Sequence, residues 1–310
     1  MKRRSLLLTA LLPLAARAQS PVVVRVGWLR APNDITLGRA RGTIERAVAA
    51  HGATIQWAGP FAAAAPALEA LNAGAIDVTA GSSTASITGL AAGVPLVVFA
   101  YQKISAAAEG ILVKHDAPMK TLADLKGHTV AVNRGGTGEY LLMRGLAHNG
   151  VDPATVKRIY LGPADAGSAF DGGHVDAWAT WDPFIAIAVQ NYGARVLADG
   201  AQIGSDNAVT LMASTTFAAT HRNLLQVLLD TARADNAWSM EHKSAAGGIW
   251  AKAMGIPSSL GDAIGVANAV PTTAVTPANL EQMKAIAAWY SESGIIPVRS
   301  DIARSVVMLE

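Results

Sequence analysis

Short apolar segments alternate with helical patterns along the first two thirds of the chain. Residues 22–27 form a β-branched run that predicts a strand, and a helical pattern over 34–51 follows it and ends at Gly52. Strands that alternate with helices at this short spacing predict an α/β fold with a largely parallel sheet. The further predicted strands are residues 53–57, 76–80, 95–101, 110–113, 129–132, 157–160, 175–179 and 194–197.

One helix–glycine–strand element occurs twice. Residues 70–80 and 169–179 each read as a helix end, a glycine, a β-branched residue, an aspartate and a short strand. Each copy leads from the carboxyl end of a strand into a polar loop, which is the edge where open α/β sheets bind ligands. The sequence therefore predicts a cleft between two lobes, formed by residues 19–105 with 208–310 and by residues 106–207.

The pattern changes after residue 197. One more strand is predicted at 209–213, and no strand is predicted from residue 216 onward. We expect the late helices to pack around the first lobe, so the chain crosses between the lobes near 102–108 and 202–210. The predicted late helices are residues 222–240, 244–254, 257–266 and 277–293.

The first eighteen residues have the form of a secretory signal peptide. Lys2, Arg3 and Arg4 precede an apolar run over 5–16, and residues 16–18 read Ala-Arg-Ala, a cleavage site with small outer residues. The run is too short to span a bilayer. The sequence contains no cysteine, which excludes a cysteine-linked lipid, disulfides and thiol catalysis. We expect a secreted protein without a lipid anchor.

Removal of this leader changes the net charge. The full chain has 25 Lys and Arg against 23 Asp and Glu, a formal charge of +2, and four of the basic residues lie in the leader. The mature chain then has 21 basic and 23 acidic residues, a charge of −2, with no clustered basic face. Nucleic acid is therefore not an expected partner.

A glycine-rich stretch, residues 133–140, joins a predicted strand to a predicted helix. Such a turn leaves the first helical N–H groups unpartnered and directs the positive end of the helix dipole at the loop, which favours an anion. The third glycine of a dinucleotide fingerprint is missing, because Leu141 stands there. With no P-loop, nucleophile elbow or metal-ligand spacing elsewhere, we expect a binding protein that uses no cofactor and no metal.

The candidate site combines two donor loops with aromatic and charged side chains. Ser82, Ser83 and Thr84 follow the first copy of the repeated element; taken alone, this loop favours ordinary helix capping, and a second such loop on the facing lobe favours ligand binding. Aromatic faces can cover an alkyl group. The remaining candidates are Gly136, Thr137, Gly138 and Glu139 in the glycine-rich stretch, with Trp28, Arg30, Trp178, Trp181 and Asp182 elsewhere.

These residues lie in stretches that resemble a known family, the periplasmic substrate-binding proteins of ABC importers for aliphatic sulfonates, with taurine and nitrate binders as relatives. The most specific stretch is 175–184, which reads VDAWATWDPF. The resemblance implies a type II-like periplasmic binding fold, in which two α/β lobes joined by two crossing strands close on a small organic anion. It also implies delivery to a permease and ATPase complex in the inner membrane. The other matching stretches are 68–77, 121–132, 162–166, 196–200, 271–273 and the helix from Pro277.

The resemblance implies that Ser82 and Ser83, Gly136 to Gly138, and Trp181 with Asp182 contact the ligand. Two positions of the second loop depart from the family, and residues 85–88 replace the acidic-proline continuation that is usual in the first loop. Thr137 is the only hydroxyl in a loop where sulfonate binders tend to have several serines, and Glu139 stands where a neutral residue or histidine is usual. An unpaired carboxylate would repel a sulfonate, so we hypothesise that Glu139 recognises the amine of a taurine-like ligand.

Several alternatives stay open at this point. The ligand is expected to be an aliphatic sulfonate, with taurine, nitrate or a thiamine-precursor-like molecule as alternatives. An enzyme similar to the thiamine-pyrimidine synthases would need catalytic Cys and His residues, and the chain has no Cys. A sensory ectodomain is a third possibility. We expect the protein to be a monomer.

Overall fold

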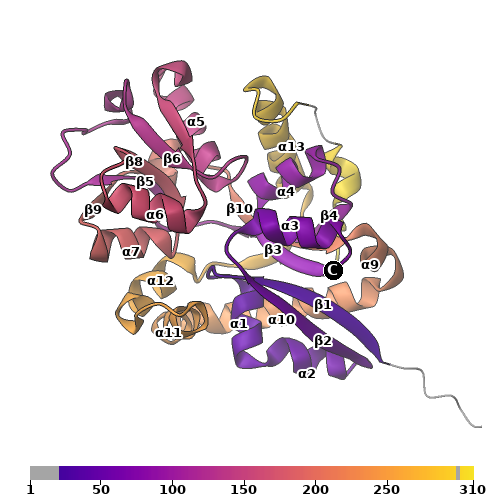
Figure 1. Ribbon diagram of the computed structural model, residues 1–310. Helices are drawn as coiled ribbons and strands as arrows, with labels where there is room; N and C mark the ends of the chain where they lie inside the picture. Colours follow the sequence, from indigo (N-terminus) through magenta and orange to yellow (C-terminus); the bar gives the residue numbers. More distant parts are fainter. Residues whose placement is uncertain (1–20, 298–300) are drawn as a thin grey trace, which may run out of the picture.

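Two β-sheets form the framework of the protein (Figure 1). The computed structural model describes residues 21–297 and 301–310, and the predicted signal peptide lies outside them. We call the six-stranded sheet with its helices lobe 1; its order is β11-β4-β10-β3-β1-β2. These strands are β1 Val22–Leu29, β2 Ala53–Phe61, β3 Val78–Ser82, β4 Leu96–Lys103, β10 Ala208–Ser214 and β11 Thr272–Ala274.

The second sheet has five strands within the described residues, in the order β7-β6-β8-β5-β9. With its helices it forms what we call lobe 2, which lies on the left in Figure 1. The lobe boundaries that the sequence predicts, at residues 105 and 207, stay a prediction. The strands of this sheet are β5 Glu109–Lys114, β6 Thr129–Val132, β7 Lys157–Tyr160, β8 Ala177–Trp181 and β9 Ala194–Asp199.

The chain passes between the lobes twice. β4 leads through the 3₁₀ helix Ala106–Ala108 into β5, and β9 leads through α8 (Gly200–Ile203) into β10. The arriving strands β5 and β10 pair antiparallel with both of their neighbours, whereas β1 with β2 and β6 with β7 are parallel. The prediction of a largely parallel sheet is wrong, because an arriving strand begins at the edge where its neighbours end.

Two local departures from the predicted pattern have simple causes. The helix expected over 34–51 is two helices, because Gly42 adopts the left-handed conformation with φ of 65° between them. A strand also occurs where none was expected: β11 pairs antiparallel with β4, Thr272 lying opposite Gln102. Three residues are too few to show the alternation that reveals a strand.

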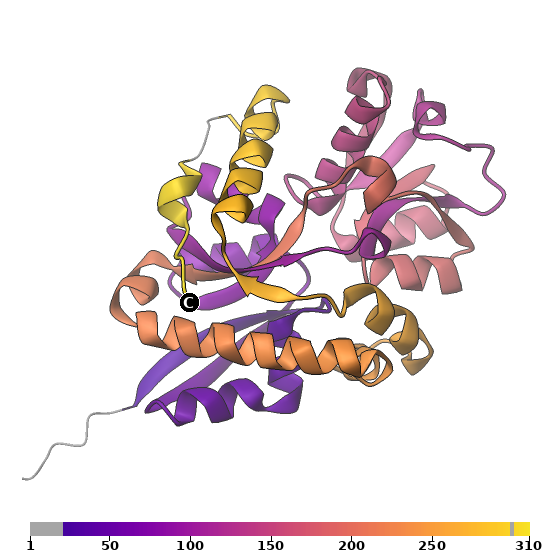
Figure 2. The ribbon, with the colours of Figure 1, turned by 180° about the vertical axis from the view of Figure 1, so that it is seen from behind.

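Helices cover both sheets, and the long helix α10 crosses one face of lobe 1 (Figure 2). In lobe 1 the helices are α1 Asp34–Arg41, α2 Thr43–Ala49, α3 Ala64–Asn72, α4 Ser83–Ala91, α9 Thr215–Thr220, α10 Arg222–Glu241, α11 Lys243–Met254, α12 Gly261–Asn268 and α13 Pro277–Glu292. In lobe 2 they are α5 Thr137–His148, α6 Pro163–Asp171 and α7 Phe184–Asn191, and the remaining 3₁₀ helices are Leu122–Leu125, Pro153–Thr155, Ser258–Leu260 and Ile302–Ser305.

The lobes also touch beside the crossings. The Tyr140 ring of α5 lies 5.7 Å from Trp289, edge-on, and 6.0 Å from Tyr290 of α13. On the opposite side, Ile187 of α7 packs against the cluster that includes Trp250 of α11. These contacts hold lobe 2 against two separate groups of lobe 1 helices.

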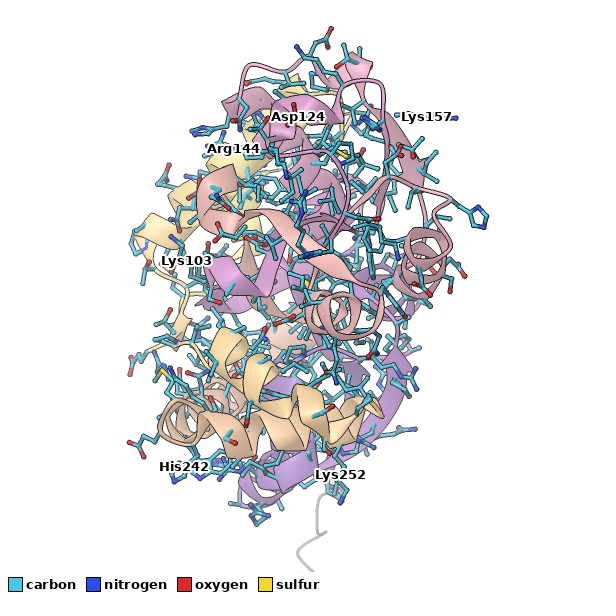
Figure 3. The ribbon with its side chains drawn as sticks, turned by 90° about the vertical axis from the view of Figure 1, so that its left-hand side faces the viewer. Lys103, Asp124, Arg144, Lys157, His242 and Lys252 are labelled. Atoms are coloured by element: carbon cyan, nitrogen blue, oxygen red, sulfur yellow. The ribbon has the colours of Figure 1, made fainter. Side chains whose placement is uncertain are left out.

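Most charged side chains lie on the surface, as the exposed residues Asp124, Lys157 and Lys252 show (Figure 3). Within the described ranges, none of the helices combines the length and the apolar character that crossing a bilayer would require. A few carboxylates are buried instead, and three of them, Glu109, Glu139 and Asp182, lie near the junction of the lobes.

Candidate ligand-binding site

A cavity of about 770 Å³ lies between the two lobes. Lobe 1 lines it with α3 and α4, and lobe 2 with the loop before α5, the segment 160–163 and the end of β8. Most of the wall is apolar, which suits a ligand that carries an apolar part, and a few polar groups in the wall can orient it. The apolar lining residues include Leu29, Ala64, Pro66, Leu68, Ala85, Val94, Ile104, Pro163 and Val209.

The first polar region of the wall is the start of α4. Ser82 ends β3 and caps the helix, because its side chain accepts the N–H of Ala85 at 3.1 Å. The hydroxyl oxygens of Ser82 and Thr84 are 2.8 Å apart. Since the first-turn N–H groups of a helix have no intrahelical partners, α4 presents a positive dipole end here.

The second polar region is the start of α5 on the opposite lobe. Gly136 is the N-cap, and Gly136 and Thr137 line the cavity. Asn133 shapes this loop, because its Oδ1 accepts the N–H of Gly138 at 2.7 Å. A second helix N-terminus therefore approaches the same cavity from the other side.

Helix α4 and the glycine-rich loop meet across the cleft. The Thr88 hydroxyl on α4 donates to the carbonyl oxygen of Gly135 at 2.5 Å. Gly135 has φ of 62°, and a Cβ there would lie 2.7 Å from Thr88 Cγ2. Glycine at this position therefore permits both the left-handed turn and the close approach of the lobes.

A third polar region lies where β8 ends. Asp182 lines the cavity at 4% exposure, and its carboxylate accepts from Asn268 Nδ2 at 2.9 Å and from the Ala186 N–H at 3.3 Å. Asn268 ends α12, so this contact also crosses the cleft. Burial raises the pKa of Asp182 from 3.8 to about 7, against the opposing effect of these two donors.

Comparison with known proteins agrees with this architecture. The model of the family described as "NMT1/THI5 like" matches residues 55–246, which is more than half of the chain. The chain belongs to the NMT1/THI5-like family. The predictions of a sulfonate-binder-like family and of a two-lobe α/β fold are confirmed by this match together with the relatives below.

Two relatives of this NMT1/THI5-like protein are similar over nearly their whole length. A putative aliphatic sulfonates-binding protein of Escherichia coli (strain K12) is 32% identical over 297 residues, 94% of this chain and 90% of that protein. The alkanesulfonate-binding protein SsuA from Xanthomonas axonopodis pv. citri, solved bound to MOPS, is 26% identical with a TM-score of 0.86, covering 94% and 99% of the two chains.

The same fold occurs in an enzyme. The desulfurization enzyme DszB has a TM-score of 0.66 at 13% identity, over 93% of this chain and 96% of that one. At that identity the likeness shows the fold alone, so the fold does not by itself separate binding proteins from enzymes.

Five of the predicted site residues line the cavity: Ser82, Gly136, Thr137, Trp181 and Asp182. Three others adjoin it without forming its wall. Ser83 directs its hydroxyl to Asn207, Thr84 lies against Ser82, and Gly138 donates to Asn133. We expect these three to support the wall residues.

Trp28, Arg30 and Trp178, which the sequence predicts as ligand contacts, do not line this cavity. On β1 and the residues after it, side chains alternate between faces, so Leu29 and Ala31 line the cavity while Trp28 and Arg30 do not. Trp28 is buried beneath the Arg39 guanidinium, 4.2 Å from Cζ to the ring centroid, and Arg30 is exposed.

Trp178 belongs to the core of lobe 2. It is 2% exposed, with the rings of Phe170 and Phe184 at 6.1 Å and 5.8 Å. The wall contact at this corner comes from Trp181, whose ring meets Phe184 edge-on at 5.6 Å.

Glu139 lies behind the glycine-rich loop and does not line the cavity, so the hypothesis that it meets an amine of the ligand does not fit this geometry. It is 3% exposed and accepts from the Gly135 N–H at 2.7 Å, the Tyr160 hydroxyl at 2.6 Å and Arg158 Nη1 at 3.1 Å. Three donors on one buried carboxylate make it a support for the loop.

Replacing Glu139 with Gln is expected to lower stability without changing ligand preference. The three donors contact both carboxylate oxygens, and the glutamine side chain has only one oxygen. Its NH₂ group would therefore face a donor, and we expect a loss of roughly 1–3 kcal/mol in the free energy of unfolding. The ratio of affinities for taurine and an alkanesulfonate should stay within about twofold of wild type. Urea unfolding measures the stability and calorimetry the two affinities, with Glu281→Gln, at an exposed position, as control. A changed affinity ratio would show that Glu139 does recognise the ligand.

Sequence reasoning missed several wall residues. Among the described residues that line the cavity, Arg134 is the one cation, and its Cζ lies 3.7 Å over the Tyr160 ring. Arg134 lies within the glycine-rich stretch, so the sequence alone already placed it next to the predicted anion loop. Asn268 comes from a distant helix, and no local pattern links it to the cleft.

The buried carboxyl of Asp182 predicts a pH dependence of stability. Its pKa is about 7 in the folded protein against 3.8 ordinarily, so the folded state holds the proton more tightly. The resulting stabilisation is full below about pH 4 and is lost as the pH rises through about 7. We expect Asp182→Asn to reduce this fall in the free energy of unfolding by roughly 2–4 kcal/mol.

Urea unfolding across this pH range measures the effect, with Asp116→Asn, at an exposed turn, as the matched control. Burial also raises the pKa values of Glu109 and Asp34 to about 7, so part of the fall in the free energy of unfolding with rising pH remains in every variant. If the free energy of unfolding changes with pH in the same way in wild type and in Asp182→Asn, ionisation of Asp182 does not destabilise the folded protein and the prediction is wrong.

Proposed function

We propose that this protein is the extracytoplasmic solute-binding subunit of an ABC importer and that it captures an organic sulfonate by closing its lobes. The observation that carries the proposal is the convergence of the N-termini of α4 and α5, from opposite lobes, on one largely apolar cavity. An anionic head between two positive helix ends and an alkyl chain along the apolar wall would satisfy both features.

The chemistry of a sulfonate matches the donors at the loops. Its head is ionised throughout the physiological pH range and offers only acceptor oxygens. Ser82 and Thr137 supply hydroxyl groups, and the first turns of both helices supply N–H groups. Each such bond to a charged head contributes about 1.5–3 kcal/mol.

The binding role, rather than catalysis, is supported by relatives that match over nearly the whole chain and are named as sulfonate-binding proteins. We further propose that the protein acts in the periplasm as a monomer, handing its ligand to a permease and ATPase complex. Incubation with alkanesulfonates, followed by analysis for released sulfite, would reveal an enzyme if any turnover occurred.

A thermal-shift panel tests the ligand class. Alkanesulfonates of increasing chain length should give the largest stabilisation, rising with each methylene, since burial of one CH₂ contributes about 0.8 kcal/mol. A ligand at about a hundred times its Kd stabilises by roughly 2.7 kcal/mol. Taurine, nitrate, sulfate and a thiamine precursor complete the panel, and a larger shift with any of them would overturn the proposed class.

A further inference from the structure

Asn207 connects both donor loops from the second crossing between the lobes. It lies between α8 and β10 and is 1% exposed. Its Oδ1 accepts from the Ser83 hydroxyl at 3.0 Å, and its Nδ2 donates to Thr137 Oγ1 at 3.1 Å and to Glu109 Oε2 at 3.0 Å. One buried amide at the crossing therefore contacts lobe 1 through Ser83 and lobe 2 through Thr137 and Glu109.

The direction of each proton in this network follows from its fixed members. The Ala208 N–H can only donate, and it donates to Ser83 Oγ at 3.2 Å, while the Ser83 hydroxyl donates to Asn207 Oδ1 at 3.0 Å. A reversed amide would set its oxygen against Glu109 Oε2 and leave the Ser83 proton unpaired. Burial raises the pKa of Glu109 to about 7, and a carboxyl protonated on Oε1 still offers Oε2 as an acceptor.

This arrangement leaves the proton of Thr137 available. Because Thr137 Oγ1 accepts from Asn207, its own hydroxyl proton points elsewhere, and Thr137 lines the cavity. We propose that Asn207 is a positioning residue that directs the Thr137 hydroxyl proton into the cavity, so that the site prefers an anion with only acceptor oxygens to an anion of equal charge that carries an O–H.

The inference rests on the proposed function and deepens it. Sulfonates and phosphonate monoanions have the same charge and a similar tetrahedral head, but the monoanion keeps one P–O–H. That group is a donor, and inward-pointing donors at the starts of α4 and α5 leave it without a partner there. The discrimination therefore depends on hydrogen-bond direction and not on charge.

Asn207→Asp tests the proposal with almost no change in shape. Where Asn207 Nδ2 donates, an aspartate oxygen accepts instead: it takes a proton from Glu109, whose Oε2 lies 3.0 Å from Nδ2, and the hydroxyl proton of Thr137, which then points away from the ligand. We expect the affinity for pentanesulfonate to fall about tenfold or more. The preference for pentanesulfonate over pentylphosphonate should fall about fivefold, measured by calorimetry at a mildly acidic pH at which the phosphonate is a monoanion.

A double-mutant cycle shows whether Asn207 acts through Thr137. Thr137→Val should cost about tenfold in sulfonate affinity in wild type but less than about threefold in the Asn207→Asp background. Glu109→Gln keeps an acceptor oxygen for Asn207, and its sulfonate affinity should stay within about threefold of wild type. Thr137→Val alone must lower the preference for sulfonate, which keeps the test valid if Asn207→Asp does not fold.

The outcomes separate the two proposals. If wild type binds no sulfonate, the proposed function fails and this inference fails with it. If wild type binds pentanesulfonate but Asn207→Asp and Thr137→Val weaken both ligands equally, only the inference is overturned, and Asn207 is then a structural residue of the crossing.

Discussion

Gly138→Ala is expected to lower sulfonate affinity about a hundredfold and the free energy of unfolding by roughly 2–3 kcal/mol. A Cβ at residue 138 would lie 2.4 Å from the carbonyl oxygen of Ala179 and 2.8 Å from Asn133 Oδ1. The Ala179 oxygen belongs to the backbone of β8, the central strand of its sheet, so it cannot move away. The start of α5 must therefore move, taking Gly136 and Thr137 away from the cavity.

Gly248→Ala is the matched control for this change. A Cβ there meets nothing within 4 Å, and alanine favours the helix α11 by about 0.5–1 kcal/mol. Urea unfolding and calorimetry with an alkanesulfonate measure both effects. Wild-type affinity in Gly138→Ala would mean that the close approach of α5 to β8 does not shape the binding loop.

Gly247→Ala is expected to cost about 3 kcal/mol or more in the free energy of unfolding. A Cβ at residue 247 would lie 1.8 Å from the carbonyl oxygen of Gly261, and one at Gly265 would lie 1.9 Å from the carbonyl of Lys243. Helices α11 and α12 therefore cross in backbone contact, and only glycine fits at the crossing. Its neighbour Gly248, with open space around it, again serves as the control.

The same substitution should also reach the ligand site. α12 ends in Asn268, whose amide donates to the buried carboxylate of Asp182 on the cavity wall. Displacing α12 would leave that carboxylate short of a partner, so we expect sulfonate affinity to fall about tenfold as well. Unfolding of Gly247→Ala at the wild-type urea concentration would show that the two helices can separate freely.

Much of the fold was predictable because its elements carry a local periodic pattern. The strand and helix that flank the glycine-rich loop were recognised from apolar spacing and a glycine-rich turn. The direction of β5 and β10 was not, because strand pairing depends on segments far apart in the chain. The division at Gly42 and the short β11 were also missed, since neither disturbs the pattern over a long window.

The two donor loops were predictable because each joins a strand to a helix, but the facing of single side chains was not. Leu29 and Ala31 line the cavity, whereas Trp28 and Arg30 do not, because successive side chains along β1 and the residues after it point to opposite faces. Asn207 could not be recognised at all. Its role depends on Ser83 and Thr137, which are brought to it only by the folded chain.

A crystal structure of the protein with pentanesulfonate would show directly whether the two helix N-termini hold the ligand. We expect the sulfonate head to lie between the N-termini of α4 and α5, with oxygens about 2.7–3.2 Å from Ser82 Oγ, Thr137 Oγ1 and first-turn N–H groups. The alkyl chain should lie along Leu68 and Ala85. A head bound elsewhere in the cavity, with neither helix N-terminus in contact, would contradict it.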